Sequence, residues 1–245
     1  MVPAPFISFH FLMSSTQVRA RTFLARSECA DEWLTSACVR TTASMQPIPL
    51  TPQQIVLVRH GATEWSTSGQ HTGKTDLPLL EEGKAQASAL QAKLASGFGD
   101  RPPGLVLSSP LRRAVDTCRL AGYGDEAELD EDLEEWDYGM YEGLTTPEIQ
   151  AQRAGWELFR DGCPGGEVLS DVARRVNRVI GRLRSNHLLT ERPALIFAHG
   201  HVLRVLTSVW CDFGPEAGRA LPFETGALGI VGWARDDPGL VGWNI

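Results

Sequence analysis

Two short apolar segments of the chain each end in a histidine that is followed by glycine. Residues 55–58 run into Arg59 and His60, and residues 194–198 run into His199. Short apolar runs of this kind are typical of buried strands in a parallel sheet, and reactive groups collect at the carboxyl edge of such sheets. A neutral imidazole is a nucleophile near neutral pH. The spacing therefore predicts two histidines at one sheet edge, where they can do nucleophilic chemistry.

Arginine side chains accompany the first histidine and follow a further predicted strand. Arg59 precedes His60, and Arg112 and Arg113 come after the predicted strand at residues 105–108, of which the first three are apolar. Guanidinium groups match phosphate oxygens with two parallel hydrogen bonds. Arg59 and one of Arg112 or Arg113 are therefore candidate contacts for a phosphoryl group. The alternative is that Arg112 and Arg113 lie on a solvated face of a helix and bind no ligand, which fits Arg112 better than Arg113.

An acidic, aromatic segment at residues 133–143 supplies a candidate proton donor. A departing alkoxide must be protonated, and Glu135 lies beside the aromatic residues Trp136 and Tyr138. We expect Trp136 and Tyr138 to exclude water from Glu135 and to keep it protonated enough to act as an acid. The alternative for this segment is an ordinary acidic surface loop.

His199 and His201 have the spacing of some zinc ligand pairs. The chain offers no third ligand at a recognisable spacing, and a polar residue at the start of a helix also serves as a cap or as a phosphate contact. We therefore expect no metal and no other cofactor. We expect the helix that follows Gly200 to offer backbone N–H groups to a bound phosphoryl group.

Strand and helix patterns alternate from residue 54 onward. Strands are expected at 55–58, 105–108, 127–129 and 194–198, with one or two more at 227–233 and 240–243. Helices are expected at 81–94, 111–120, 145–154 and 169–185 and from about 201, with Pro110 as the first helical residue of the second. The alternation indicates an α/β fold, a three-layer α/β/α sandwich with a mostly parallel central sheet.

Composition limits the classes of partner. The net charge of -7 over 245 residues argues against a broad nucleic-acid surface, which needs clustered basic residues. No apolar stretch approaches the roughly 18 to 20 residues that cross a bilayer, so no membrane partner is expected. The five cysteines are odd in number and lack disulfide or zinc spacing, which indicates reduced thiols in a cytoplasmic compartment. The sequence specifies no oligomeric state.

The N-terminal part of the chain has a different composition. The first 27 positions hold three arginines and no acidic residue, which is typical of an organellar transit peptide. The alternative is a disordered or wrongly started extension, with Met45 as the natural start. We expect residues 1–50 to be an N-terminal extension and residues 51–245 to be one catalytic domain. The location is cytoplasmic, or organellar if residues 1–44 are a genuine transit peptide.

Four motifs in order resemble those of the histidine phosphatases, a family that includes cofactor-dependent phosphoglycerate mutases. Residues 57–65 resemble its Arg-His-Gly signature, and residues 198–200 resemble its second histidine motif. Between them, residues 109–114 and 135–143 resemble its arginine and acid motifs. The resemblance covers about residues 54–232 and implies a phosphoglycerate mutase-like fold.

The resemblance implies a role for each residue of a catalytic set. His60 attacks phosphorus and forms a phosphohistidine without a metal, and Glu135 protonates the leaving oxygen and then activates water. The motif assigns the second phosphate arginine to Arg113. Arg59, Arg113 and His199 stabilise the transferring phosphoryl group, with His199 as the charged partner of the nucleophile.

Within the family, the chain resembles the sedoheptulose-bisphosphatase-like branch. Mutases commonly carry Asn in place of Ser66 and His201, and they tend to have a longer insert after the acid loop. A Ser usually follows the Gly-Glu pair where this chain has Val168, which leaves the role of Glu167 open. The resemblance implies substrate contacts at Thr63, Ser66, Gln70, Thr72, Gly73, Tyr138, Gly200 and His201.

These features together predict a metal-independent phosphatase that hydrolyses small phosphorylated metabolites, with sugar bisphosphates among the candidates. The alternatives are a phosphoglycerate mutase and a catalytically inactive protein that binds phosphorylated ligands. Lys74, Arg160 and Arg204 are candidate contacts for a second phosphate, and each is equally well read as a solvated or structural charge.

Overall fold

The computed structural model describes residues 49–245, and the predicted extension at 1–50 lies almost wholly outside them. Six strands form one sheet in the order β3-β2-β4-β1-β5-β6. The strands are β1 (Ile55–Arg59), β2 (Leu105–Ser108), β3 (Glu128–Leu129), β4 (Ala194–Ala198), β5 (Leu228–Ala234) and β6 (Asp237–Trp243). The first four run parallel to one another, whereas β5 runs antiparallel to both of its neighbours, β1 and β6. The predicted α/β fold with a mostly parallel sheet is confirmed.

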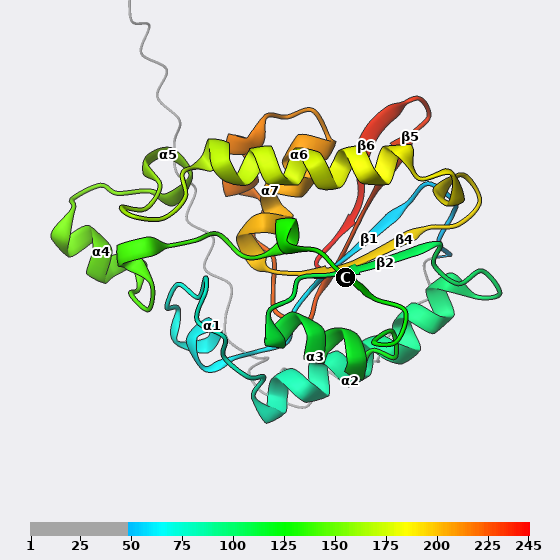
Figure 1. The fold of residues 1–245 in the computed structure, drawn as a ribbon, viewed down its shortest axis with the longest axis horizontal. Coiled ribbons are helices and arrows are strands. Elements are labelled where there is room, and N and C mark those ends of the chain that lie inside the picture. Colours follow the sequence, from blue (N-terminus) through cyan, green and yellow to red (C-terminus); the bar gives the residue numbers. More distant parts are fainter. Residues whose placement is uncertain (1–48) are drawn as a thin grey trace, which may run out of the picture. The chain divides into compact units, whose positions relative to one another are not determined.

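Helices cover both faces of this sheet. Helices α2 (Glu81–Phe98) and α3 (Arg112–Leu120) pack together on one face, and α6 (Leu169–Ser185) and α7 (Gly200–Trp210) pack together on the other (Figure 1). Shorter helices are α1 (Glu64–Ser68), α4 (Thr146–Gln152) and α5 (Leu158–Asp161), with 3-10 turns at Glu131–Leu133, Gly139–Tyr141, His187–Thr190 and Pro215–Ala220. The chain therefore forms the predicted three-layer sandwich.

The alternation of side chains along β1 gives each face of the sheet its own core. Ile55 and Leu57 belong to the apolar cluster that includes α6 and α7, whereas Val56 and Val58 belong to the cluster that includes α2 and α3. A central parallel strand is covered on both faces, so its sequence is a continuous apolar run. This is why residues 55–58 could be recognised as a strand.

The helix boundaries differ from the prediction in two places. Helix α2 continues past residue 94 to Phe98, because Phe98 extends the apolar row and is only 5% exposed in the core. Helix α3 begins at Arg112, so Pro110 lies before the helix and is not its first residue. The carboxylate of Asp76 accepts the N–H of Arg112 at 2.8 Å, which fixes the helix start there.

The short helix α1 follows β1 in a segment where the sequence predicted no helix. Thr63 and Ser66 form a capping box, in which each side chain pairs with the backbone N–H of the other.

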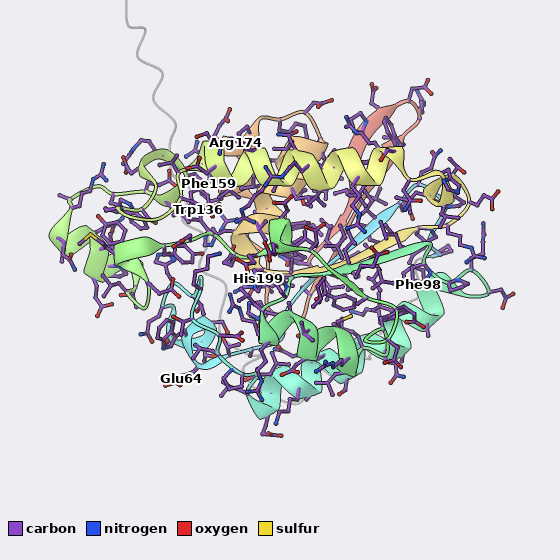
Figure 2. All side chains as sticks on the ribbon, in the orientation of Figure 1. Glu64, Phe98, Trp136, Phe159, Arg174 and His199 are labelled. Atoms are coloured by element: carbon purple, nitrogen blue, oxygen red, sulfur yellow. The ribbon has the colours of Figure 1, made fainter. Side chains whose placement is uncertain are left out.

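Glu64 of α1 and Arg174 of α6 project away from the interior, whereas Trp136 and His199 lie inside it (Figure 2). Within the described residues, no helix is long and apolar enough to cross a membrane.

Candidate active site

The register of the sheet brings three strand ends together. Strand β1 pairs in parallel with β4, and β4 pairs in parallel with β2. The next residues, His60, His199 and Ser109, therefore leave the sheet side by side. The ring centroids of His60 and His199 are 5.2 Å apart, and the backbone N–H of His60 donates to the Ala198 carbonyl at 3.0 Å. The two histidines meet as the sequence predicts.

His60 is held in one tautomer by its own backbone. Its Nδ1 lies 2.8 Å from the carbonyl oxygen of Gly61, and a carbonyl only accepts, so Nδ1 carries the proton. Burial, together with the charges of Arg113 and Arg59, holds the pKa of His60 well below its usual value. The ring is therefore neutral, and Nε2 keeps its lone pair.

The glycine after His60 has a packing role that was not predicted. A Cβ at Gly61 would lie 2.2 Å from the carbonyl oxygen of Gly83 in α2. A Cβ at Gly83 would in turn lie 2.2 Å from the Ala62 carbonyl oxygen. The pair lets α2 touch the loop that carries His60, backbone against backbone.

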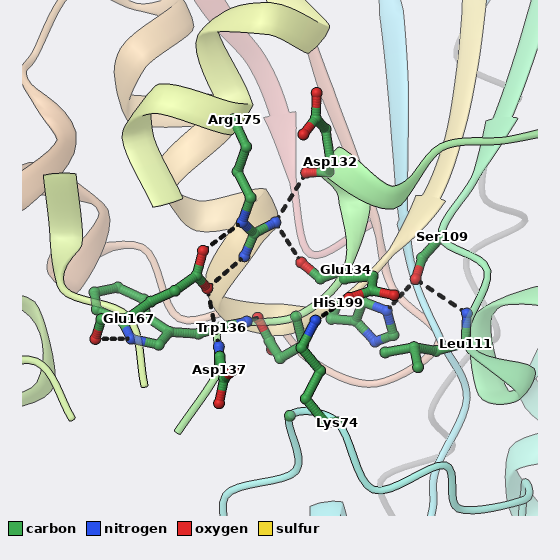
Figure 3. A network of polar contacts seen from close by, with 12 residues as sticks. Lys74, Ser109, Leu111, Asp132, Glu134, Trp136, Asp137, Glu167, Arg175 and His199 are labelled. Atoms are coloured by element: carbon green, nitrogen blue, oxygen red, sulfur yellow. Dashed lines mark hydrogen bonds and ion pairs between the residues drawn. The ribbon is translucent and has the colours of Figure 1, made fainter. Parts of the chain in front are cut away.

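His199 is fully buried and has both ring nitrogens occupied. Arg113 donates from Nε to Nδ1 of His199 at 3.0 Å, so Nδ1 carries no proton. The other nitrogen, Nε2, lies 2.8 Å from the hydroxyl of Ser109 (Figure 3). Burial and the neighbouring Arg113 also hold the pKa of His199 well below its usual value. The prediction of a charged His199 is therefore wrong for this state, because a guanidinium lies against it.

The structure separates the two neighbouring arginines of α3. Arg112 is exposed and pairs with Asp116 one turn along the helix. Arg113 is fully buried, and its two terminal nitrogens donate to the carbonyls of Thr72, Gly73 and Thr75 at 2.9 to 3.0 Å. Arg113 thus places a buried positive charge beside both histidines while it holds the loop at residues 72–75.

Glu135 is bound to the N-terminus of α7. Its carboxylate accepts the backbone N–H groups of Trp136 at 2.9 Å and of His201 and Val202 at 3.0 Å. The sequence predicted aromatic surroundings but not these three donors. They also change the expectation for α7, because its first N–H groups are directed at Glu135 and not at a ligand. Glu135 is therefore fixed in direction and is only 6% exposed.

Arg59 reaches from the end of β1 over the start of α7. One terminal nitrogen donates to the Phe223 carbonyl, and Nε is buried without a hydrogen-bond partner. A Cβ at Gly200 would lie 3.3 Å from the guanidinium carbon of Arg59, so glycine leaves room for this cation. A buried N–H donor without a partner is unusual in a folded protein and fits an anion that arrives from outside.

One pocket contains Arg59, His60 and Glu135. Six of the eight predicted substrate contacts also line it: Ser66, Gln70, Thr72, Tyr138, Gly200 and His201. The other two have structural tasks, since Thr63 caps α1 and the N–H of Gly73 donates to the carboxylate of Glu142. A Cβ at Gly73 would lie 2.6 Å from the Trp136 carbonyl oxygen, which explains the glycine.

The outer wall of the pocket is aromatic and uncharged. The hydroxyl of Tyr138 lies 2.7 Å from Nδ1 of His201, and burial raises the pKa of Tyr138 and lowers that of His201. The tyrosine and the imidazole are therefore both uncharged. The ring of His71 packs against Tyr138 in a tilted arrangement with centroids 4.6 Å apart, and burial lowers the pKa of His71 to about 4. Sequence reasoning missed His71, because it lies in a polar loop without a motif.

The three candidate contacts for a second phosphate differ in position. Lys74 pairs with Glu134, and Arg160 pairs with Asp161; neither cation lines the pocket. Arg204 does line it. Among residues 49–245, no three His, Cys, Asp or Glu side chains are placed to hold a metal ion.

The chain is similar to named phosphatases over most of its described length. It is 37% identical over 180 residues to an acid phosphatase of Mycobacterium tuberculosis, a match that covers 74% of this chain and 86% of the relative. It is 36% identical over 191 residues to the sedoheptulose 1,7-bisphosphatase of Saccharomyces cerevisiae, with 68% and 70% covered.

Solved structures share the fold. An open reading frame product of Mycobacterium tuberculosis superposes with a TM-score of 0.73 and 34% identity, over 79% of this chain and 97% of that one. A mycobacterial glucosyl-3-phosphoglycerate phosphatase in complex with VO3 gives a TM-score of 0.68 and 29% identity, over 78% and 98%. The sequence model of the histidine phosphatase superfamily, branch 1, matches residues 55–245. The chain belongs to this superfamily.

Proposed function

We propose that this protein hydrolyses phosphate monoesters of small metabolites through a phosphohistidine on His60. The observation that carries the proposal is the tautomer of His60. The Gly61 carbonyl holds the proton on Nδ1, so the lone pair of Nε2 belongs to a ring that lines the same pocket as Arg59 and Glu135. The phosphatase names of the relatives support the same reaction class.

The reaction has two steps at one phosphorus atom. In the first, Nε2 of His60 bonds to phosphorus, the ester P–O bond breaks, and Glu135 gives its proton to the leaving oxygen. In the second, water attacks the phosphohistidine, Glu135 takes the proton from that water, and inorganic phosphate leaves. His60 returns to its neutral form and Glu135 to its protonated form, so atoms and charge balance.

Arginine side chains provide the positive charge that metal ions provide in other phosphoryl transfer enzymes. Arg59 offers its unpartnered Nε, and the charge of Arg113 is close enough to lower the pKa of His60. Such fixed cations stabilise the oxygens of the transferring group in a site that is partly closed to water. We therefore expect turnover without an added metal.

The pocket fits a substrate with a second anionic group. Arg204 lines the pocket, and its Nε and one terminal nitrogen donate to the carbonyls of Gly218 and Arg219 at 2.9 and 2.8 Å. These bonds hold the guanidinium in place and leave its other terminal nitrogen for a ligand. Sugar bisphosphates are therefore the substrate class that we favour, in keeping with the bisphosphatase among the relatives.

We propose a cytoplasmic location, or an organellar one if residues 1–44 are a genuine transit peptide. Cys118, Cys163 and Cys211 are buried and unpaired in the described part of the chain. Burial raises the pKa of Cys118 and of Cys163 to about 12, which keeps these thiols protonated and unreactive.

The test is phosphate release with a chelator present. Wild-type protein should release phosphate from sugar bisphosphates and from p-nitrophenyl phosphate, and His60→Ala should lose at least about 10⁴-fold in kcat. His187→Ala changes an exposed histidine outside the pocket and serves as the matched control. Substantial chelator-resistant activity in His60→Ala refutes the nucleophile. Interconversion of phosphoglycerates without phosphate release identifies a mutase instead.

A further inference from the structure

We propose that Arg175 and Glu167 are positioning residues that aim the carboxylate of Glu135 at the leaving oxygen of the substrate. The inference rests on the proposed role of Glu135 as the proton donor. It assigns a role to Glu167, which the sequence analysis left open. It also adds Arg175, which lies outside the four motifs named above.

The two side chains form a paired contact beside the acidic segment at residues 133–143. Nε of Arg175 lies 2.9 Å from Oε1 of Glu167, and a terminal nitrogen lies 3.1 Å from Oε2 (Figure 3). The side chains are only 10% and 22% exposed. Arg175 occupies the apolar face of α6, where Val172 and Val176 are fully buried. Stability alone does not explain a charged residue at that position, because a buried ion pair contributes little net stability.

Arg175 binds the backbone just before the acid. Its remaining terminal nitrogen donates to the carbonyl oxygens of Asp132, at 2.8 Å, and of Glu134. Glu134 is the residue that precedes Glu135. The planar guanidinium therefore fixes the direction from which the chain enters the acid residue.

Glu167 binds the backbone just after the acid. Its Oε2 accepts the N–H of Asp137 at 2.9 Å, and its own N–H donates to the Asp137 carbonyl at 2.9 Å. Its carbonyl oxygen accepts the indole N–H of Trp136 at 3.0 Å. The ion pair thus holds the chain on both sides of Glu135, while the N-terminus of α7 holds the carboxylate itself.

This arrangement predicts a loss that depends on the leaving group. A misplacement of about 1 Å costs on the order of 10²-fold in rate, and general acid catalysis contributes 10²- to 10⁴-fold in total. An alkyl ester needs the proton, because its alkoxide is a poor leaving group. A p-nitrophenyl ester does not, because its phenolate is stable without one. A misdirected Glu135 should therefore affect the first substrate far more than the second.

The experiment compares glycerol 3-phosphate with p-nitrophenyl phosphate in Glu167→Gln and Arg175→Lys. We compare kcat/KM because it reports the steps up to the formation of the phosphohistidine. It should fall about 10- to 100-fold for glycerol 3-phosphate and less than about 3-fold for p-nitrophenyl phosphate. Glu167→Gln keeps the size and one acceptor oxygen of the side chain, so it gives an answer even where Arg175→Lys does not fold.

Arg178→Ala is the matched control. Arg178 lies one turn further along α6 and also binds Asp132, but it contacts the exposed side-chain carboxylate and not the backbone. Both kcat/KM values should stay within about 2-fold of the wild type, because surface ion pairs contribute little. An equal leaving-group effect in this variant would overturn the assignment to Arg175 and Glu167.

A double variant separates positioning from general stability. In a Glu135→Gln background, adding Glu167→Gln should leave kcat/KM for glycerol 3-phosphate unchanged, because the group being positioned is already gone. A full additional loss in that background, or an equal loss on both esters in Glu167→Gln alone, overturns the positioning role. If Glu135→Gln alone affects both esters equally, Glu135 is not the acid and the proposed mechanism fails first.

Discussion

The ends of β1 and β4 look alike in sequence but present their histidines differently. His60 uses one ring nitrogen for a backbone carbonyl and has the other available in the pocket. His199 uses one nitrogen for the guanidinium of Arg113 and the other for the hydroxyl of Ser109. Burial lowers the pKa of both rings, so the protonation state does not distinguish them. The difference lies in their hydrogen-bond partners, and those partners decide which ring is free to attack.

The first way to sharpen the comparison is to remove the second histidine. His199→Ala should lower kcat by about 10²- to 10³-fold, the range for loss of one preorganised polar group beside the transferring charge. The loss should be smaller than in His60→Ala, since the nucleophile is still present. Steady-state kinetics of both variants on p-nitrophenyl phosphate provide the measurement. Equal losses would mean that the two rings are not functionally distinct.

A smaller change tests the partner of His199. Ser109→Ala removes the oxygen that faces Nε2 of His199 and leaves the ring held by Arg113 alone. We expect kcat to fall about 5-fold, in line with the roughly 1 kcal/mol of a typical hydrogen bond. Ser108→Ala is the control, because that buried hydroxyl donates to the Ser109 carbonyl and contacts neither ring. A similar loss in both variants would point to general damage of the strand end.

The smallest effect concerns stability as a function of pH. The rings of His60 and His199 are neutral in the folded protein, whereas in the unfolded chain they take up protons below about pH 6.5. The unfolded chain then binds more protons, so the free energy of unfolding falls as the pH falls from about 6.5 toward the lowered folded pKa values. For His71, with a pKa of about 4, we expect a loss of about 1 to 2 kcal/mol between pH 6.5 and pH 5. Urea unfolding of wild type and His71→Asn measures it, and equal pH slopes in the two proteins would contradict the assignment.

The sequence was sufficient for the strands that carry the site. Residues 105–107 and 194–198 are apolar on both faces, and such runs have few alternatives to a buried parallel strand. The helix at 169–185 was equally clear from its apolar period. Helix α1 was missed because five residues show no period, and its capping box was the only local signal.

The partners of the site residues could not be predicted in the same way. A motif fixes residue types along the chain, whereas the neutral state of His199 depends on Arg113 and Ser109, which reach it across the sheet edge. The N–H donors to Glu135 come from α7, more than sixty residues away in sequence. Arg175 did leave a signal, since it stands between Val172 and Val176 on an apolar helix face.

Trapping the phosphoenzyme tests the central claim most directly. Wild type, His199→Ala and His60→Ala are mixed with substrate carrying labelled phosphorus, quenched within one turnover, and assayed for bound label in acid and in base. We expect an acid-labile, base-stable adduct on His60 in the wild type. The same adduct should form more slowly in His199→Ala and should not form in His60→Ala. An acid-stable serine adduct, a base-labile aspartyl adduct, or label that persists in His60→Ala would contradict it.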